Sequence, residues 1–468
     1  MPSLPARPAP GVTHLLARWV AWLDAPGPGG GRATAWMPTP PPQPSPAVLA
    51  QALVAAIDQR LTAQLGPVLR HPGLQALEGR WLGLAALLDA VPDGGGCRVR
   101  LLDLAPGDLA SHLQRFEGVA WDQSPLFRRL HDEGFGQLGG QPWGCLLLDH
   151  EFDQRPGDLA CLAALARLAA AAHAPCLTGA GPGLVHWPAW SDLPRSRDAW
   201  RQVRALATPG WQGLRARDDA RYLVLALPRG RARPARGWPG AESRGWHWVD
   251  RPDDPGAELW CNAVWGLGCR LLRGLPHEGW GLGPGAPSPG RALPRPRRQA
   301  WPGCRRGWDL APASELPLSP AWVAAFAQQG LLAWPGEESP ALAGAGGVTD
   351  APTLWRDPAG AGLSLPDLLA CCRVAHHLKV LLRDRLGQGE GPVALQAQLE
   401  SWLSRWVLAN PEAADGSMRA RRPFVAAQVR LDPVPGAPGH WQAALLLQRH
   451  RHRPGLRLQW PVQAPWPG

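Results

Sequence analysis

The sequence predicts an α/β protein, mixed α+β overall, in which a partly parallel sheet is flanked by helices and followed by a strand-rich C-terminal part. Two observations lead to this fold class. In the first half of the chain, apolar runs of strand length alternate with longer segments of helical periodicity, an order that favours right-handed crossovers between parallel strands. Near the end of the chain, three apolar runs separated by turn residues indicate further strands.

The first predicted element is a long helix that follows a proline-rich segment. Residues 1–44 end in "MPTPPPQP", and such prolines favour an extended, weakly ordered arm. Ser45 is suited to cap a helix, and a leucine or isoleucine then recurs at every fourth position from Leu49 to Leu65. We therefore expect folded structure from residue 45 onward.

A second helix should start at His71 and Pro72, because proline is well tolerated in a first helical turn. Apolar side chains, including Leu77 and Trp81, recur on one face of this helix. We expect the two helices to pack together, with Leu77 and Trp81 buried and Glu78 paired to an arginine.

The later elements are predicted from the same two periodicities. Strands are expected at 97–105, 144–150, 175–181, 221–228, 424–434, 440–449 and 456–462. Helices are expected at 107–116, 158–173, 258–272, 319–334, 365–386 and 395–408. These elements suggest a flexible arm at 1–44, an α/β domain at 45–230, a Pro/Gly/Arg-rich middle region at 231–360 and a helix-plus-strand domain at 361–468.

Composition limits the possible functions only weakly. The formal net charge is +10, but almost all basic residues are arginine, which is typical of a GC-rich genome. The densest basic runs, 229–238 and 291–308, contain many prolines and glycines, as solvated loops do, so a nucleic-acid binder is an alternative rather than the main prediction. The nine cysteines form no CxxC pair, and no apolar run is long enough to cross a bilayer. We expect a cytoplasmic protein without membrane insertion.

No pattern nominates a catalytic or cofactor site. The glycine-rich stretch 178–184 follows a predicted strand, but it is not GxGxxG, and Pro182 lacks the N–H that a phosphate cradle needs. Cys372 and His376 have a two-ligand metal spacing, yet a core cysteine and a helix-face histidine explain them better. We expect no enzyme activity, cofactor or metal. An α/β nucleotide-binding protein or an enzyme of unknown reaction is the alternative.

Several motifs together resemble one known family. They are "HPGLQALEGRWLGL", "DQSPLFRRLHDEGFGQLGGQPWGCLLLDHEF", "AAAAHAPCLTGAGPGL", "WQGLRARDDARYLVLALPR", "LPDLLACCRVAHHLK" and the closing strands that follow Pro423. In this order they resemble the large sheath subunit of type VI secretion systems, the TssC/VipB family. The chain's only tyrosine, Tyr222, and its only lysine, Lys379, both fall on motif positions.

The resemblance implies a structural role without bond chemistry. It implies pairing with a small TssB-like sheath subunit and with copies of the chain itself around an inner tube protein, with further contacts to a baseplate and a disassembly ATPase. The motif positions that it assigns to structure and assembly are His71, Pro72, Leu77, Glu78, Trp81, Ser124, Pro125, Phe127, Gly139, Gly140, Pro142, Arg221, Tyr222, Pro228, Arg229, Arg373, His376, Lys379 and Pro423. The segment after Arg229 and the glycine-rich stretch 279–285 depart from the family pattern.

Overall fold

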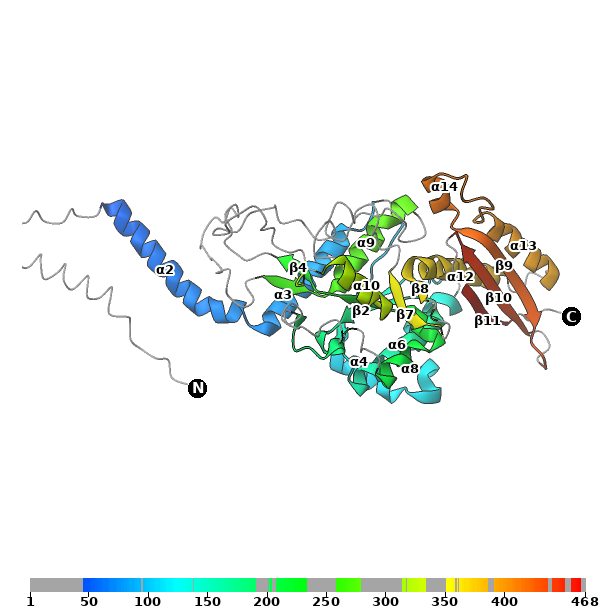
Figure 1. Cartoon of the computed structure of the whole chain (residues 1–468), viewed down its shortest axis with the longest axis horizontal. Helices are drawn as coiled ribbons and strands as arrows, with labels where there is room; N and C mark the ends of the chain where they lie inside the picture. Colours follow the sequence, from blue (N-terminus) through cyan, green and yellow to red (C-terminus); the bar gives the residue numbers. More distant parts are fainter. Residues whose placement is uncertain are drawn as a thin grey trace, which may run out of the picture. The chain divides into compact units, whose positions relative to one another are not determined.

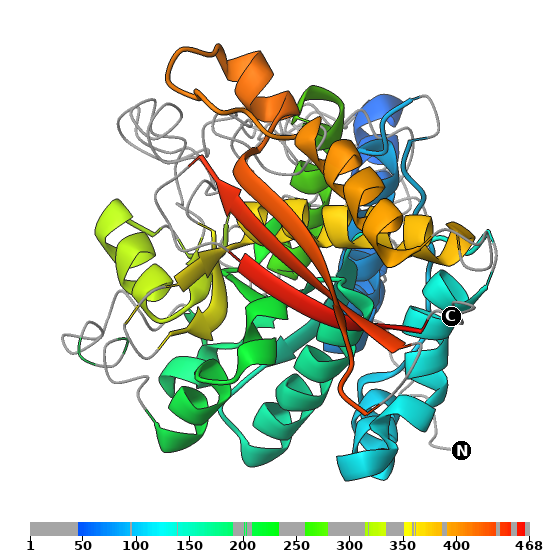
Figure 2. The same cartoon turned by 90° about the vertical axis from the view of Figure 1, so that its right-hand side faces the viewer.

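A computed structural model of the whole chain is shown in Figures 1 and 2. It describes residues 45–93, 96–137, 139–190, 201, 203, 208–233, 258–278, 314–316, 318–333, 351–357, 360, 362–385, 391–436, 440–450 and 456–463. The arm at 1–44 and most of the middle region at 231–360 therefore lie outside the described residues. The chain divides into two compact units, Met1–Gln59 and Arg60–Gly468. In the first unit, the described structure is Ser45 and the start of helix α2 (Pro46–Leu69), which confirms the predicted long helix.

The described helices of the second unit begin and end as follows. They are α3 Pro72–Asp89, α4 Pro106–Arg115, α5 Pro125–Phe127, α6 Pro156–Ala172, α8 Pro209–Arg215, α9 Ala263–Glu278, α10 Pro320–Gln328, α12 Leu365–Arg385, α13 Pro392–Ser404 and α14 Gly416–Arg421. The 3-10 segments are η1 Gly118–Gln123, η3 Pro182–Val185 and η5 Asp218–Tyr222, and η2 Arg128–Gly136 is a π-helix.

A four-stranded parallel sheet lies at the centre of the second unit. Its strands are β1 Leu146–Phe152, β2 Cys176–Ala180, β3 Leu223–Leu227 and β6 Leu331–Ala333, in the order β1-β2-β3-β6. Strands β2 and β3 are buried along their whole length, whereas edge strand β1 is half-buried up to Phe152. Strand–helix–strand connections produce this arrangement, so the partly parallel sheet is confirmed.

The sheet separates two apolar cores, because successive side chains of a strand point to opposite faces. Leu223 and Leu225 of β3 belong to the larger core, which also holds buried residues of α4, α6, α8, α10 and α12. Val224 and Ala226 belong to the smaller core, which is closed by α3 and α9. Two layers of helices therefore enclose the parallel sheet.

Helix α3 packs on the smaller core through a face of mostly small residues that also holds Leu87. Gly79 and Gly83 are buried against the chain around Trp265, while Leu77 is 49% exposed and Trp81 is 60% exposed. The expectation that Leu77 and Trp81 are buried is wrong. A Cβ at Gly83 would lie 2.5 Å from the Trp265 ring, so the helix approaches this ring too closely for any residue but glycine. Leu87 is buried further along the same face, whereas Leu77 and Trp81 point outward.

The closing strands form a second, antiparallel sheet in the order β11-β10-β9, as expected (Figure 2). They are β9 Phe424–Pro433, β10 His440–Arg449 and β11 Leu456–Gln463. Val429 and Leu445 of this sheet join the larger core together with Leu395 and Leu399 of α13. The C-terminal sheet is thus continuous in its packing with the α/β part of the chain.

Three predicted segments differ from the structure. Residues 97–105 form no strand: Cys97 and Val99 pack against the smaller core, but the leucines that follow are exposed. The segment 258–272 opens with strand β5 (Leu259–Cys261), which pairs with β4 (Gly230–Arg233), before α9 begins. The segment 319–334 contains α10 and then β6, the fourth strand of the sheet.

The remaining strands, β7 (Pro352–Arg356) and β8 (Gly362–Ser364), form a small antiparallel pair before α12. Among the described helices, none is both long and apolar enough to cross a membrane.

Candidate assembly site

Two of the predicted motif positions, Tyr222 and His376, meet at the C-terminal end of α6. The helix ends at His173, which adopts a left-handed conformation with φ of 48°. A hydrogen bond of 3.0 Å joins the Tyr222 hydroxyl to Nδ1 of His173, and Nε2 of His376 donates to the carbonyl of Ala172 at 3.1 Å. Burial lowers the pKa of His376 to about 4 and holds the pKa of His173 well below its usual value. The two histidines are therefore neutral groups that tie α6, β3 and α12 together.

Lys379 extends this cluster toward the π-helix η2. Its Nζ lies 4.4 Å from the centroid of the Phe135 ring, and Phe135 lies 5.6 Å from the ring of His376. Burial lowers the pKa of Lys379 to about 8. A cation over an aromatic face is attracted by the ring quadrupole, so this contact fastens η2 to α12. Sequence reasoning did not select His173 or Phe135 as site residues.

The motif around Ser124 begins with the cap of the short helix α5, which continues directly into η2. The Ser124 side chain accepts a hydrogen bond from the N–H of Phe127 at 3.0 Å, and Pro125 occupies the first turn, so the helix is capped in the expected manner. Gly140 lies so close to the carbonyl oxygen of Glu133 that a Cβ there would be 2.6 Å from it. Gly139 has φ of 79°, and Pro142 packs near Gly134. These positions have structural roles within the subunit.

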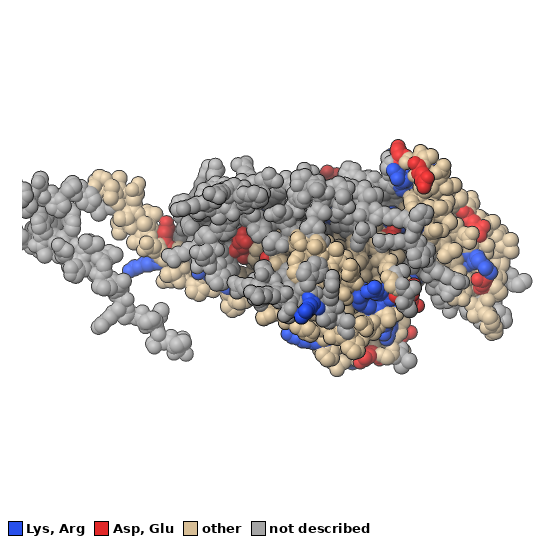
Figure 3. Space-filling model, in the orientation of Figure 1, with Lys and Arg blue, Asp and Glu red and all other residues tan. Residues whose placement is uncertain are grey.

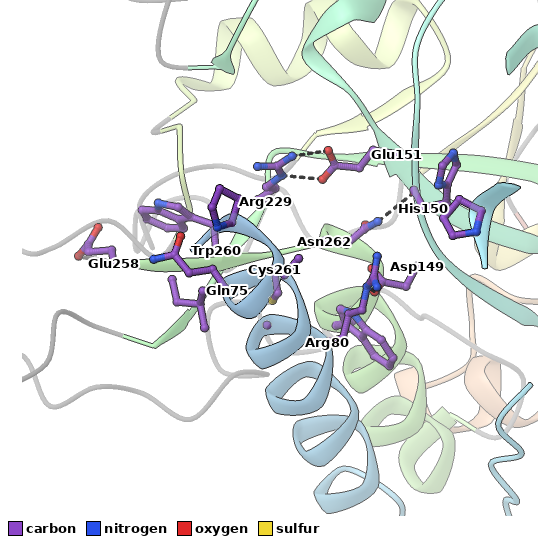
Figure 4. A pocket seen from close by; sticks show the side chains of 16 residues that line it. Gln75, Arg80, Asp149, His150, Glu151, Arg229, Glu258, Trp260, Cys261 and Asn262 are labelled. Carbon is purple, nitrogen blue, oxygen red and sulfur yellow. Dashed lines mark hydrogen bonds and ion pairs between the residues drawn. The ribbon is translucent and has the colours of Figure 1, made fainter. Parts of the chain in front are cut away.

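A hollow of about 830 Å³ lies between α3, the carboxyl end of β1, and strand β5 (Figure 4). At one side, the Arg229 guanidinium donates two hydrogen bonds of 2.7 and 2.6 Å to the carboxylate of Glu151. Nearer to α3, Arg80 lies 3.2 Å from the carboxylate of Asp149. Burial raises the pKa of Asp149, because Arg80 only partly offsets the lost hydration.

Further ion pairs stand beside the hollow. Glu78 of α3 lies 2.8 Å from Arg233 of β4, which confirms the predicted pairing of Glu78 with an arginine. Glu258, which lines the hollow, lies 3.2 Å from Arg231. The described carboxylates here have guanidinium partners, which suits a contact surface better than an acid–base site. Asp149 and Glu151 both belong to the segment "DHEF" of β1, and sequence reasoning selected neither as a site residue.

The glycine-rich stretch does not form an anion cradle. A Cβ at Gly181 or Gly183 would lie 2.3–2.5 Å from the carboxyl group of Asp153. The side chain of Asp153 therefore occupies the space that a phosphate would need, and its negative charge would repel one. This geometry removes the glycine loop as support for the nucleotide-binding alternative, which also rested on the alternation of strands and helices.

The other motif positions have separate places. Arg221 bonds to Asp218 and lies over the Trp355 ring at 5.1 Å, and Arg373 is exposed on α12. Pro228 follows β3 through a cis peptide bond, and Pro423 directly precedes β9. The motif positions thus belong to several different contacts, not to one site. On the described part of the face in Figure 3, basic side chains are interspersed with acidic ones. The basic runs at 234–238 and 291–308, on which the nucleic-acid alternative rests, lie outside the described residues.

The charged groups beside the hollow form ion pairs with one another, and several large apolar side chains are exposed on helices α2 and α3. Both features are typical of a subunit in a larger assembly. Comparison with known families agrees with this class. Residues 51–333 match the model described as "EvpB/VC_A0108, tail sheath N-terminal domain", and residues 359–463 match "EvpB/VC_A0108, tail sheath gpW/gp25-like domain".

Type VI secretion system sheath protein TssC1 of Pseudomonas aeruginosa is 31% identical over 419 residues, which cover 87% of this chain and 84% of that protein. The chain therefore belongs to the TssC/VipB family of type VI secretion sheath subunits.

Proposed function

We propose that this chain pairs with a small TssB-like sheath subunit, and that the pairs polymerise helically around an inner tube and drive its ejection by contracting. Family membership is the observation that carries the proposal. In this role the chain works without bond chemistry, cofactor or metal, in the cytoplasm. The cysteines support a reducing compartment, since all eight that the structure describes are free thiols.

The C-terminal sheet supports strand exchange between subunits. Within the described residues, β11 pairs only with β10, so its other edge is open to a further strand. Pro461 lies in β11, and proline is tolerated mainly on edge strands. Adding a strand to such an edge gives register and affinity through main-chain hydrogen bonds. The arm at 1–44 and the strands after Pro423 are the proposed links between neighbouring subunits.

Helix α2 supports a second kind of contact. Leu53 and Ile57 are more than half exposed on this helix, and an apolar stripe of this kind is normally covered by a partner. Contraction would then occur when the subunits rotate as rigid bodies at such interfaces, so that the polymer changes from an extended to a contracted packing. On this proposal, residues 45–230 and 361–468 act as the structural domains of the subunit, and the middle region at 231–360 is the divergent part.

Co-expression tests the proposal. The full chain and a TssB-like subunit, produced together, should copurify and form tubules in negative-stain electron microscopy, whereas each chain alone should not. A discrete particle that ignores the small subunit, under conditions that assemble other sheaths, would contradict the proposed function.

A further inference from the structure

Three consecutive residues of β1, Asp149, His150 and Glu151, line the hollow between α3 and β5. Successive side chains of a regular strand point to opposite faces, so three in a row cannot share one cavity. A bulge makes this possible. The register with β2 passes from Leu148 directly to Glu151, and no residue of β2 stands opposite Asp149 or His150. Bulges redirect side chains, often beside functional sites, so this hollow is shaped by an interruption of the sheet.

The bulge is fixed by the residues behind it. The carbonyl of His150 accepts hydrogen bonds from Oγ1 of Thr178 at 2.8 Å and from Nδ2 of Asn262 at 2.9 Å. Oδ1 of Asn262 accepts a hydrogen bond of 3.0 Å from the N–H of Val264, so both ends of this amide are held. A Cβ at Gly179 would lie 2.7 Å from the same amide, which shows how closely β2 passes. The carboxylates of the hollow are therefore carried by a rigid backbone.

Three carboxylates lie around the guanidinium group of Arg229. Its hydrogen bonds to Glu151 and the charges of Glu315 and Asp149 raise its pKa. One oxygen of Glu315 is buried without a hydrogen-bond partner among the described residues. The second cation here, Arg80, lies beside Asp149 and is 53% exposed (Figure 4). Two guanidinium groups thus accompany three carboxylates, and this part of the hollow lacks one positive charge.

The other charged groups nearby do not supply the missing charge. Glu258 pairs with Arg231, and Glu78 pairs with Arg233, so each of these carboxylates has its own guanidinium partner. Burial lowers the pKa of His150, which is therefore neutral at pH 7. The described lining also includes Trp260, and an indole ring attracts a cation to its face.

We propose that the hollow receives an arginine side chain from a neighbouring copy of this chain in the polymer. This inference rests on the proposed function. Charge complementarity selects the occupant, because the chain has a net charge of +10 and 48 basic residues, of which all but Lys379 are arginine. A guanidinium group also matches carboxylates with its planar fork and stacks on aromatic rings. The hollow, at about 830 Å³, has room for such a side chain.

The contact would be head-to-tail, with the acidic hollow of one copy against a basic surface of the next. A two-fold contact would instead bring two hollows together, and like charges that face each other across an interface oppose binding. Head-to-tail contacts that do not close into a ring continue as helical filaments. The hollow would therefore contribute to polymerisation and not to pairing with the small subunit.

The test uses the full chain co-expressed with a TssB-like small subunit, and it measures how much of the purified pair sediments at increasing concentration. Asp149→Asn should raise the concentration for half-sedimentation at least about tenfold, because it removes one partner of a desolvated charge contact. The small subunit should copurify as with the wild type. Asp218→Asn is the matched control, since Asp218 also pairs with an arginine, but in η5, which precedes β3 at the opposite end of the parallel sheet. This control should sediment like the wild type.

A second variant fills the hollow from within. Ala76 lines the hollow and is exposed on α3, so Ala76→Arg keeps a good helix former and places a guanidinium group of the same chain there. This variant should reduce sedimentation as Asp149→Asn does, while its melting temperature stays at the wild-type value. Ala76→Gln, which adds a long side chain without charge, should sediment like the wild type. If Asp149→Asn lowers the melting temperature, the two Ala76 variants decide the result.

Three results would overturn the inference. In the first, Asp149→Asn and Ala76→Arg sediment like the wild type, which means that no cation enters the hollow in the polymer. In the second, both variants lose the small subunit during purification, which would make that subunit the occupant. In the third, Asp218→Asn or Ala76→Gln impairs sedimentation as strongly as Ala76→Arg. A wild-type pair that never sediments would be a different failure, because it would remove the proposed function itself.

Discussion

Replacing Gly83 with alanine tests how closely α3 packs on the smaller core. The new Cβ would lie 2.5–2.7 Å from three atoms of the Trp265 ring, well inside van der Waals contact. Trp265 is only 8% exposed, so the ring has little room to move. Overpacking a well-packed core costs about 1–3 kcal/mol, and the gain from replacing a helical glycine with alanine is about 1 kcal/mol. Since three ring atoms are involved at once, we expect a net loss of about 2 kcal/mol in the free energy of unfolding.

Gly266→Ala is the matched control for this change. Gly266 lies on α9 next to Trp265, and a Cβ there would meet no atom within 4 Å. This variant should therefore gain about 0.5–1 kcal/mol from helix propensity alone. Urea denaturation followed by circular dichroism measures both, and the two variants should differ by about 3 kcal/mol. If Gly83→Ala proved as stable as Gly266→Ala, the packing that holds Trp81 outward would be refuted.

Three further predictions concern the buried cluster and the hollow. Tyr222→Phe removes the hydrogen bond to His173 and should cost about 1–2 kcal/mol, measured as a lower urea midpoint at constant slope. Stability should fall as the pH is lowered from 6.5 toward 4, because the unfolded chain then binds protons at His173 and His376 that the folded chain, in which burial lowers both pKa values, does not bind. His376→Gln should flatten that pH dependence, and an unchanged slope would exclude His376 as its cause. Glu151→Gln weakens the ion pair with Arg229, whose side chain is 41% exposed, so we expect the free energy of unfolding to fall by only about 1 kcal/mol. This loss should shrink further near 1 M salt, and a loss that salt does not change would contradict an ion-pair origin.

The fold was predictable where the spacing of apolar residues in the sequence matches the buried side of the helix or strand. The fully buried strands β2 and β3 appear as short apolar runs, and α6 appears as a long helical pattern between strands. The pattern failed at 97–105, where the alternation of apolar residues is correct for Cys97 and Val99, but no ladder forms. Alternating apolar residues indicate an extended segment with one buried side. A β-strand also requires backbone hydrogen bonds to a neighbouring strand, which the alternation does not predict.

The orientation of α3 could not be derived from the rule that large apolar residues face the core. That rule fails when a helix approaches a tryptophan so closely that only glycine fits. The spacing of Gly79 and Gly83, four residues apart, is the sequence signal that could have revealed the close-packed face. The cluster of His173, Tyr222 and His376 was hidden for another reason. Its members come from three elements far apart in the chain, and only the tertiary fold brings them together.

Lys379 has a practical consequence for experiments on the assembled protein. Because no other lysine exists in the chain, an amine-reactive dye or cross-linker has one side-chain target per subunit besides the N-terminal amine. With a pKa of about 8, a substantial fraction of this amine is uncharged and nucleophilic in mildly alkaline buffer, yet the Phe135 ring shields it. The rate at which Lys379 is acylated would therefore report how often η2 separates from α12, in a free subunit or within a polymer.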